Sequence, residues 1–303
     1  MILSEKYRPR TILEVKGQDE LRAEMLSIVN GDLEMQHYLF YSPEGGVGKT
    51  TVARALAKDL GYQLVEFNAS SKKERGIEFV EEHIIPLTRS GSKERIFLLD
   101  EADQLTDAAQ SALKGVIENA SGYFILTCNR LPKVSRWLQS RCQVRTFKAI
   151  TQDDVIETLN NIAVKETGVG IDKVVAEKIY ATHVGDLRNS IGALQVYLAH
   201  RHKISEESAN QFISSLGISK INPKSFLRMC FLTKNHDDAV RMLRGDLRAD
   251  IRTVFDEAMN TNAEVNSKMK VIEASIISER DILNGVDEEI VRHNYVRLLI
   301  GGQ

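Results

Sequence analysis

Short apolar runs alternate with helical patterns through the first half of the chain. Four runs have the length and composition of strands, at residues 38–41, 63–68, 96–99 and 123–127. The third run is continuously apolar, which is typical of a strand buried on both faces. Between the first two runs, apolar residues recur every four positions up to Gly61, so we expect a helix over residues 49–60. Strands that alternate with helices predict an α/β fold with a parallel sheet.

Helical periodicity replaces the strand signals after about residue 146. Thr151, followed by Gln and two Asp residues, predicts a helix start, and the glycines at 168 and 170 separate that helix from the next. Asn222-Pro223 marks a second break, and the pattern from there to residue 300 is helical. We therefore expect an α/β core (1–148), a small helical domain (149–218) and a C-terminal helical domain (219–303).

The composition is typical of a soluble protein and does not indicate a binding partner. The 303 residues are 43% hydrophobic and 27% charged, and their formal net charge is -2. Any contact with DNA therefore needs a local basic surface, because the overall charge does not attract phosphate. The sequence has no apolar run of transmembrane length and no signal-peptide pattern at its start, so we expect an intracellular protein, in the cytoplasm, nucleoid or nucleus. Its three cysteines form no CxxC pair, which argues against a zinc site or a disulfide framework.

A glycine-rich segment, residues 42–51, follows the first predicted strand and opens the predicted helix. This is the context of a Walker A loop, in which backbone N–H groups and the helix N-terminus surround phosphates. Lys49 would reach the β- and γ-phosphates of ATP, and the Thr50 hydroxyl would ligate Mg²⁺. The predicted nucleotide-binding residues of the loop are Gly45, Gly46, Val47, Gly48, Lys49, Thr50 and Thr51. Pro43 stands where the consensus has glycine, and an ordinary glycine-rich turn is the alternative interpretation.

Acidic and amide side chains follow the next two predicted strands of the core. Asp100 would hold the Mg²⁺ beside the loop through water, and Glu101 would polarise the attacking water. Asn129, after the fourth strand, would lie between the γ-phosphate and that water, although an asparagine there is also a common turn former. Lys49, Glu101 and Asn129 are thus candidate catalytic residues of an ATPase.

Several further motifs resemble those of clamp-loader ATPases, in particular the replication factor C small-subunit family. They are Glu5-Lys6-Tyr7-Arg8-Pro9-Arg10, Val15-Lys16-Gly17-Gln18, Asn68-Ala69-Ser70, Glu74-Arg75-Gly76-Ile77, Leu99-Asp100-Glu101-Ala102-Asp103, Ser140-Arg141-Cys142, Gly185-Asp186-Leu187-Arg188 and residues 281–290. The resemblance implies an AAA+ P-loop core, a helical lid and an all-helical collar domain for oligomerisation. It also places Tyr7, Arg8 and Val15 near the adenine of ATP.

Two arginines receive roles from the same resemblance. Arg141 would be an arginine finger that completes the active site of a neighbouring subunit, and Arg188 would contact the γ-phosphate of its own site. A guanidinium that stabilises the transferring phosphoryl group contributes ~10³ to 10⁵ in rate. The alternative for either residue is a surface salt bridge, which contributes little.

The segment after Glu101 has an apolar stripe at helical spacing, made by Ala109, Ala112, Leu113, Val116 and Ile117. Gln110 and Lys114 lie four residues apart and off that stripe, so we expect them to project together from the helix. The resemblance implies that Gln110 couples DNA binding to Glu101. Lys114 stands where the family usually has Arg. Periodicity alone indicates only a solvated face.

Contacts with DNA and with a clamp are the least specific of these expectations. Lys72, Lys73 and Arg75 precede a helical stretch and could meet DNA phosphates, or they could be solvated surface. Residues 83–87 are largely apolar and could insert into a ring-shaped sliding clamp, with core packing as an equal alternative.

The resemblance implies a motor subunit that works with other copies of itself and a large subunit. It would use ATP to open a sliding clamp and place it on primer–template DNA, and hydrolysis would release the loader. Two alternatives remain. A Holliday-junction branch-migration helicase shares the Arg-Pro and Gly-Gln start but would have a C-terminal winged helix. A non-catalytic scaffold subunit would have lost residues that this sequence keeps.

Overall fold

The computed structural model describes residues 2–71, 73–89, 93–183, 185–215, 221–243, 246–261 and 264–301. The chain divides into two compact units, Met1–Ala199 and His200–Gln303. The predicted boundaries at residues 148 and 218 remain predictions. Within the described ranges, no helix is long and apolar enough to cross a membrane.

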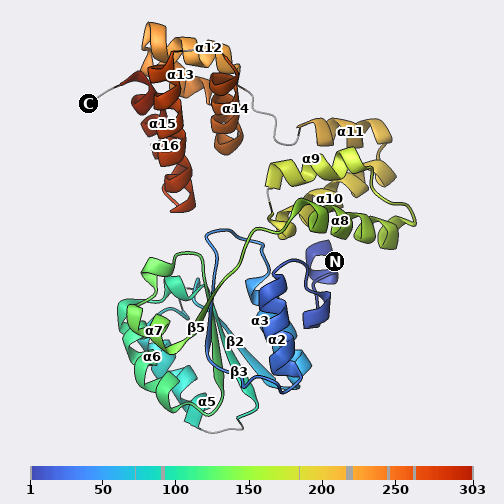
Figure 1. Ribbon diagram of the computed structural model, residues 1–303, viewed down its shortest axis with the longest axis vertical. Coiled ribbons are helices and arrows are strands. Elements are labelled where there is room, and N and C mark those ends of the chain that lie inside the picture. The colour runs from blue at the N-terminus through green and yellow to red at the C-terminus, as the bar shows by residue number, and fades with distance from the viewer. Residues whose placement is uncertain are drawn as a thin grey trace. The chain divides into compact units, whose positions relative to one another are not determined.

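A five-stranded parallel sheet forms the centre of the first unit, with the strand order β2-β3-β4-β1-β5 (Figure 1). The strands are β1 (Tyr38–Tyr41), β2 (Gln63–Asn68), β3 (Arg95–Asp100), β4 (Tyr123–Cys128) and β5 (Gln143–Thr146). The α/β fold and its four expected strands are confirmed. The edge strand β5 was not expected, because its residues are only partly buried and its sequence has no apolar run.

Helices cover both faces of this sheet. Not every helix of the first unit lies on the sheet. The helices of this unit are α1 (Leu3–Lys6), α2 (Asp19–Val29), α3 (Lys49–Leu60), α4 (Ile77–Phe79), α5 (Ile85–Arg89), α6 (Asp107–Asn119), α7 (Arg136–Arg141), α8 (Gln152–Thr167), α9 (Lys173–His183) and α10 (Leu187–Lys203), the last of which runs past the boundary between the units. Figure 1 shows α2 and α3 on one face and α5, α6 and α7 on the other.

The central strand β3 supplies apolar side chains to both faces, as its continuous apolar run predicts. Ile96 and Leu98 pack into the core that includes Leu56 of α3. Phe97 and Leu99 pack into the core that includes Leu113 of α6. The alternation follows from the two-residue period of a strand. This packing on both faces also anchors the end of β3, where the carboxylates of Asp100 and Glu101 lie.

The predicted limits of two helices are confirmed. Helix α3 begins after Gly48 and ends before Gly61, and both glycines have the left-handed backbone that disfavours other residues (φ 100° and 70°). Helix α8 begins after Thr151, whose Oγ1 accepts a hydrogen bond from the N–H of Asp154.

The second unit is helical throughout its described residues, which contain no strand. Its helices are α11 (Glu206–Ser215), α12 (Pro223–Arg228), α13 (His236–Met242), α14 (Leu247–Asn260), α15 (Val265–Leu283) and α16 (Glu288–Ile300). Helix α12 starts at the predicted break, with Asn222 as its N-cap and Pro223 as its first residue. Phe226 and Tyr295 stack at 6.2 Å inside the core of the unit.

Replacing Leu98 with Ala should destabilise the first unit strongly. Leu98 is fully buried in β3, and truncating a buried leucine costs about 2–5 kcal/mol in the free energy of unfolding. The matched control is Leu13→Ala, because Leu13 is 73% exposed and should change stability by less than about 0.5 kcal/mol. The measurement is denaturant unfolding followed by the fluorescence of Trp137, the only tryptophan of the sequence. Equal losses in the two variants would contradict the burial of β3.

Candidate active site

The loop between β1 and α3 holds Lys49 at its centre. Gly46 and Gly48 have positive φ (66° and 100°), which lets the loop turn tightly before the helix starts. The buried Lys49 ammonium donates hydrogen bonds to the carbonyl oxygen of Glu44 (2.9 Å) and to Oδ1 of Asn129 (2.7 Å). Burial lowers the pKa of Lys49, and nearby groups that include Asp100 partly oppose this shift. The geometry therefore brings the loop lysine and the amide after β4 into direct contact.

Asp100, at the end of β3, joins the loop to β4. Its Oδ1 accepts hydrogen bonds from the hydroxyls of Thr50 (2.8 Å) and Thr127 (2.5 Å). Thr127 also accepts a hydrogen bond from the N–H of Glu101 at 3.0 Å. Sequence reasoning missed Thr127, although a polar residue near the end of a buried strand was a usable signal. These oxygen atoms are of the hard type that Mg²⁺ prefers.

Glu101 has an unusual backbone for a residue with a side chain (φ 58°, ψ 44°). This left-handed conformation costs roughly 1–2 kcal/mol for a residue other than glycine. Burial raises the pKa of the Glu101 carboxyl, and the charges of Asp100 and Asp103 raise it further. A carboxylate with a raised pKa that lies in a cleft is a good candidate for a general base.

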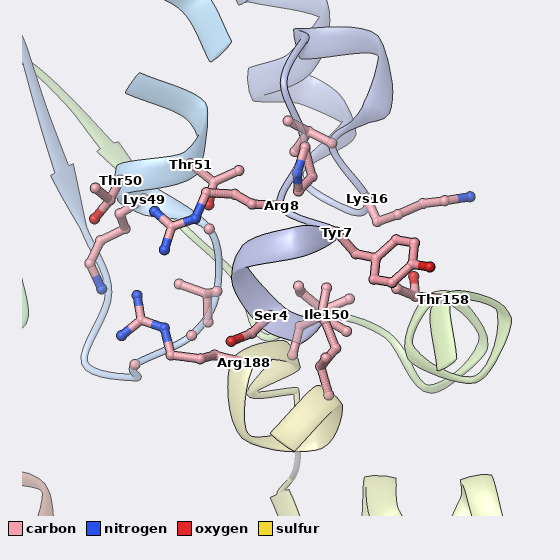
Figure 2. Close-up of a pocket in the computed structure, with 18 of the residues that line it drawn as sticks. Ser4, Tyr7, Arg8, Lys16, Lys49, Thr50, Thr51, Ile150, Thr158 and Arg188 are labelled. Atoms are coloured by element: carbon pink, nitrogen blue, oxygen red, sulfur yellow. The ribbon is translucent and has the colours of Figure 1, made fainter. Parts of the chain in front are cut away.

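A cavity of about 550 Å³ lies above this edge of the sheet. The sequence-predicted residues that line it are Tyr7, Arg8, Val15, Gly45, Gly46, Val47, Gly48, Lys49, Thr50, Thr51, Asp100, Glu101, Asn129 and Arg188. Figure 2 shows the cationic groups of Arg8, Lys49 and Arg188 pointing into this cavity. Three cations beside backbone amides at a helix start form a site for a polyphosphate.

Helix α8 closes another side of the cavity, and sequence reasoning missed its contribution. Thr158, Asn161, Ile162 and Lys165 line the cavity. Their spacing of three and four residues places them on one helix face, which was the available signal. The N-terminal segment is tied to the same helix, since the Tyr7 hydroxyl and the Lys6 ammonium both donate to Glu166 (2.5 and 2.6 Å).

Asp186 brings the start of α10 against the loop. Its carboxylate caps the helix by accepting a hydrogen bond from the N–H of Asn189 at 2.9 Å. A Cβ atom added to Gly46 would lie 1.8 Å from the same carboxylate. Arg188 follows two residues later and lines the cavity.

Arg141 does not line the cavity. It ends α7 and lies at the surface, where its guanidinium donates hydrogen bonds to Glu118 of α6. The structure therefore separates Arg141 from the other predicted catalytic residues, Lys49, Glu101 and Asn129, which all line one cavity.

Comparisons with known proteins identify the family. Residues 38–149 match the family model for ATPases associated with various cellular activities. The replication factor C small subunit of Staphylothermus marinus is 33% identical over 312 residues, which cover 96% of this chain and 92% of that protein. The small subunit of Methanococcus maripaludis is 33% identical and covers 94% of both chains. The chain belongs to the replication factor C small-subunit family. The resemblance drawn from the motifs is thus confirmed.

Solved structures of lower sequence identity share the fold of this family member. The Holliday junction branch migration motor RuvB of Thermotoga maritima superposes with a TM-score of 0.57 at 17% identity, over 82% of this chain and 88% of that one. At this identity the likeness supports the fold alone. The replication factor C relatives, at nearly twice that identity, decide the family.

The predicted position of the Gln110 side chain is wrong. Gln110 is 3% exposed rather than projecting with Lys114, which is exposed. Its amide donates to the carbonyl oxygens of Leu105 (3.2 Å) and Lys133 (3.0 Å), and its Oε1 accepts from the N–H of Ser135 (2.7 Å). Helical periodicity places Gln110 off the apolar stripe correctly, but it cannot show that backbone groups of another segment cover this side of the helix.

The other predicted contact residues lie away from the cavity. Lys73 and Arg75 are exposed, and Lys72 falls outside the described residues. In the apolar segment 83–87, Ile84 is fully buried in the core, so core packing accounts for that residue. Ile77 and Leu87 are partly exposed, at 38% and 37%.

Replacing Gly46 with Ala should destabilise the first unit by about 2 kcal/mol. The added Cβ would strain the left-handed backbone and displace the Asp186 carboxylate from its capping position. Gly45→Ala is the matched control, because its Cβ would lie 3.7 Å from Asp186 and its φ is not positive. Thermal unfolding without nucleotide measures the difference. If both variants unfold alike, the contact between Gly46 and Asp186 does not stabilise the unit.

Proposed function

We propose that this ATPase is a clamp-loader subunit. Together with other copies and a large subunit, it opens a ring-shaped sliding clamp and loads it on primer–template junctions during DNA replication, and ATP hydrolysis triggers its release. Family membership supports the class of machine. The position of Arg141 supports a site that is shared between subunits.

The observation that carries the proposal is the division of the catalytic residues. Lys49, Glu101 and Asn129 line one cavity, whereas Arg141 lies outside it and pairs with Glu118 on the surface. A finger in this position would act on nucleotide held by a neighbour. Hydrolysis would then depend on assembly, as a loader requires.

In the cavity, water would attack the γ-phosphorus of ATP, and the products would be ADP and phosphate. Glu101 would accept the proton of the attacking water, and Asn129 would orient it. Lys49 and Arg188 would stabilise negative charge on the phosphates. Thr50 and Asp100 would hold Mg²⁺, and the ion would supply further neutralisation of the phosphate charge.

Gln110 would couple DNA to this chemistry through the backbone rather than by direct contact. Its side chain holds Lys133 and Ser135, which lie between β4 and α7. Lys114 shares the helix and is exposed, so it remains a proposed DNA contact together with Lys72, Lys73 and Arg75. A DNA-induced shift of α6 would reach the segment between Asn129 and Arg141.

A branch-migration motor is the alternative that the sequence left open, although the described residues of the second unit contain no strand for a winged helix. Stimulation of the ATPase separates the two. A loader should respond to sliding clamp plus primed DNA, and a branch-migration motor should respond to four-way junction DNA. A scaffold subunit should show no turnover with either.

Replacing Arg141 with Ala should lower clamp- and DNA-stimulated hydrolysis by ~10³-fold or more, because the guanidinium that stabilises the transition state is lost. Binding of a fluorescent ATP analogue should be unchanged. Arg54→Ala is the matched control, since Arg54 forms a similarly exposed ion pair with Glu66 (both side chains 37% exposed). Full turnover in Arg141→Ala assemblies would rule out a finger at this position.

Hydrolysis should fall on acidification at a pH above the ordinary glutamate pKa of about 4.3. Burial, Asp100 and Asp103 raise the pKa of Glu101, and only its ionised form can accept the proton. Asp103→Asn removes one of the charges that raise this pKa, so the acidic limb should move to lower pH. The measurement is the pH profile of turnover at saturating MgATP. An unmoved limb would show that Glu101 does not set it.

A further inference from the structure

The surface around Arg141 contains four side chains from two neighbouring helices. Lys114 and Glu118 lie one turn apart on α6, and Trp137 and Arg141 lie one turn apart on α7. We propose that Glu118 is a positioning residue for Arg141, and that it acts with the ring of Trp137 to hold the finger in the orientation that a neighbouring subunit's nucleotide requires. This inference rests on the proposed action of Arg141 in trans.

Glu118 contacts one edge of the guanidinium. Its Oε1 accepts hydrogen bonds from both Nε (3.1 Å) and Nη2 of Arg141. The Nη1 atom donates to the Ser140 hydroxyl at 3.2 Å. These contacts use three of the five N–H donors of an arginine. Two donors then remain for a phosphate, which guanidinium groups bind in a bidentate manner.

Trp137 restrains the guanidinium from a second direction. The Arg141 Cζ atom lies 4.8 Å from the centre of the indole ring. The ring packs against the apolar core between the sheet and α6, so it provides a fixed surface. The Lys114 ammonium lies 5.9 Å from the same ring. Cations in this position are attracted to the face of an indole ring, also at exposed sites.

An exposed ion pair contributes little to the free energy of unfolding, so its effect should be on the position of the Arg141 guanidinium. Glu118 and Arg141 have side-chain exposures of 41% and 37%. An ion pair of this exposure changes the ratio of two conformational populations, with and without the pair, by about fivefold at most. Small displacements of a catalytic group are nevertheless costly, because the barrier depends on its position in the transition state. We therefore expect the pair to affect turnover more than folding.

Glu118 could instead act as a brake by neutralising the charge of the finger. The two roles predict opposite results for Glu118→Gln and Glu118→Ala. A single oxygen, Oε1, accepts both hydrogen bonds, and the amide oxygen of glutamine can do the same without charge. Positioning therefore survives in Glu118→Gln and is lost in Glu118→Ala. Removal of a brake would accelerate both variants.

The experiment measures steady-state ATP hydrolysis by the assembled protein with its partner subunits, sliding clamp and primed DNA. Glu118→Ala should lower kcat by about fivefold with KM for ATP unchanged. Glu118→Gln should stay within about twofold of the unchanged protein. Glu66→Ala, which removes the partner of Arg54 in the matched ion pair, should have no effect. The emission spectrum of Trp137 reports whether the packing of α6 and α7 persists in each variant.

Three outcomes contradict the proposal or its basis in distinguishable ways. Unchanged kcat in Glu118→Ala, with Arg141→Ala inactive, would overturn the positioning role and leave the finger in place. Faster turnover in both Glu118 variants would assign Glu118 as a brake and also overturn positioning. Full activity of Arg141→Ala would refute the trans finger itself, and the inference with it.

Discussion

A single carboxylate oxygen connects three elements of the core. Oδ1 of Asp100, at the end of β3, accepts hydrogen bonds from Thr50 at the start of α3 and from Thr127 in β4. The connection exists because parallel strands end at one edge of the sheet, and β3, β4 and β1 are consecutive there. The positions of Lys49, Glu101 and Asn129 follow from it, since each lies within two residues of one of these three.

Around this fixed centre, the rest of the cavity is assembled from segments that are far apart in sequence. The N-terminal segment contributes Tyr7 and Arg8, and α10 contributes Arg188. Polar side chains contribute to holding these pieces, as in the hydrogen bond from Tyr7 to Glu166, while Ile12 and Val15 of the N-terminal segment pack into the core that includes α3. Polar contacts between exposed side chains can open and close with modest changes in free energy.

The sequence was sufficient to predict an element where the period of its apolar residues and the residues that bound it indicate the same structure. The run that forms β3 and the glycines that bound α3 predicted both the elements and the loop between them. It was insufficient where a tertiary contact decides the outcome. Strand β5 forms because an exposed sheet edge is available, and Gln110 is buried because backbone groups of the segment before α7 satisfy its amide. The Glu118 contact depends in the same way on the packing of α6 against α7, which no spacing in the chain reveals.

The backbone of Glu101 has a consequence for how this position can vary. The fold alone would favour glycine or asparagine here, because either residue adopts the left-handed conformation at little cost. A glutamate is retained against that preference, with its charge also opposed by burial and by two neighbouring carboxylates. Selection for stability and selection for the proposed general base would therefore act in opposite directions on this one residue. A library of variants screened only for thermal resistance would therefore be expected to lose the glutamate at position 101 early, and with it the proposed general base.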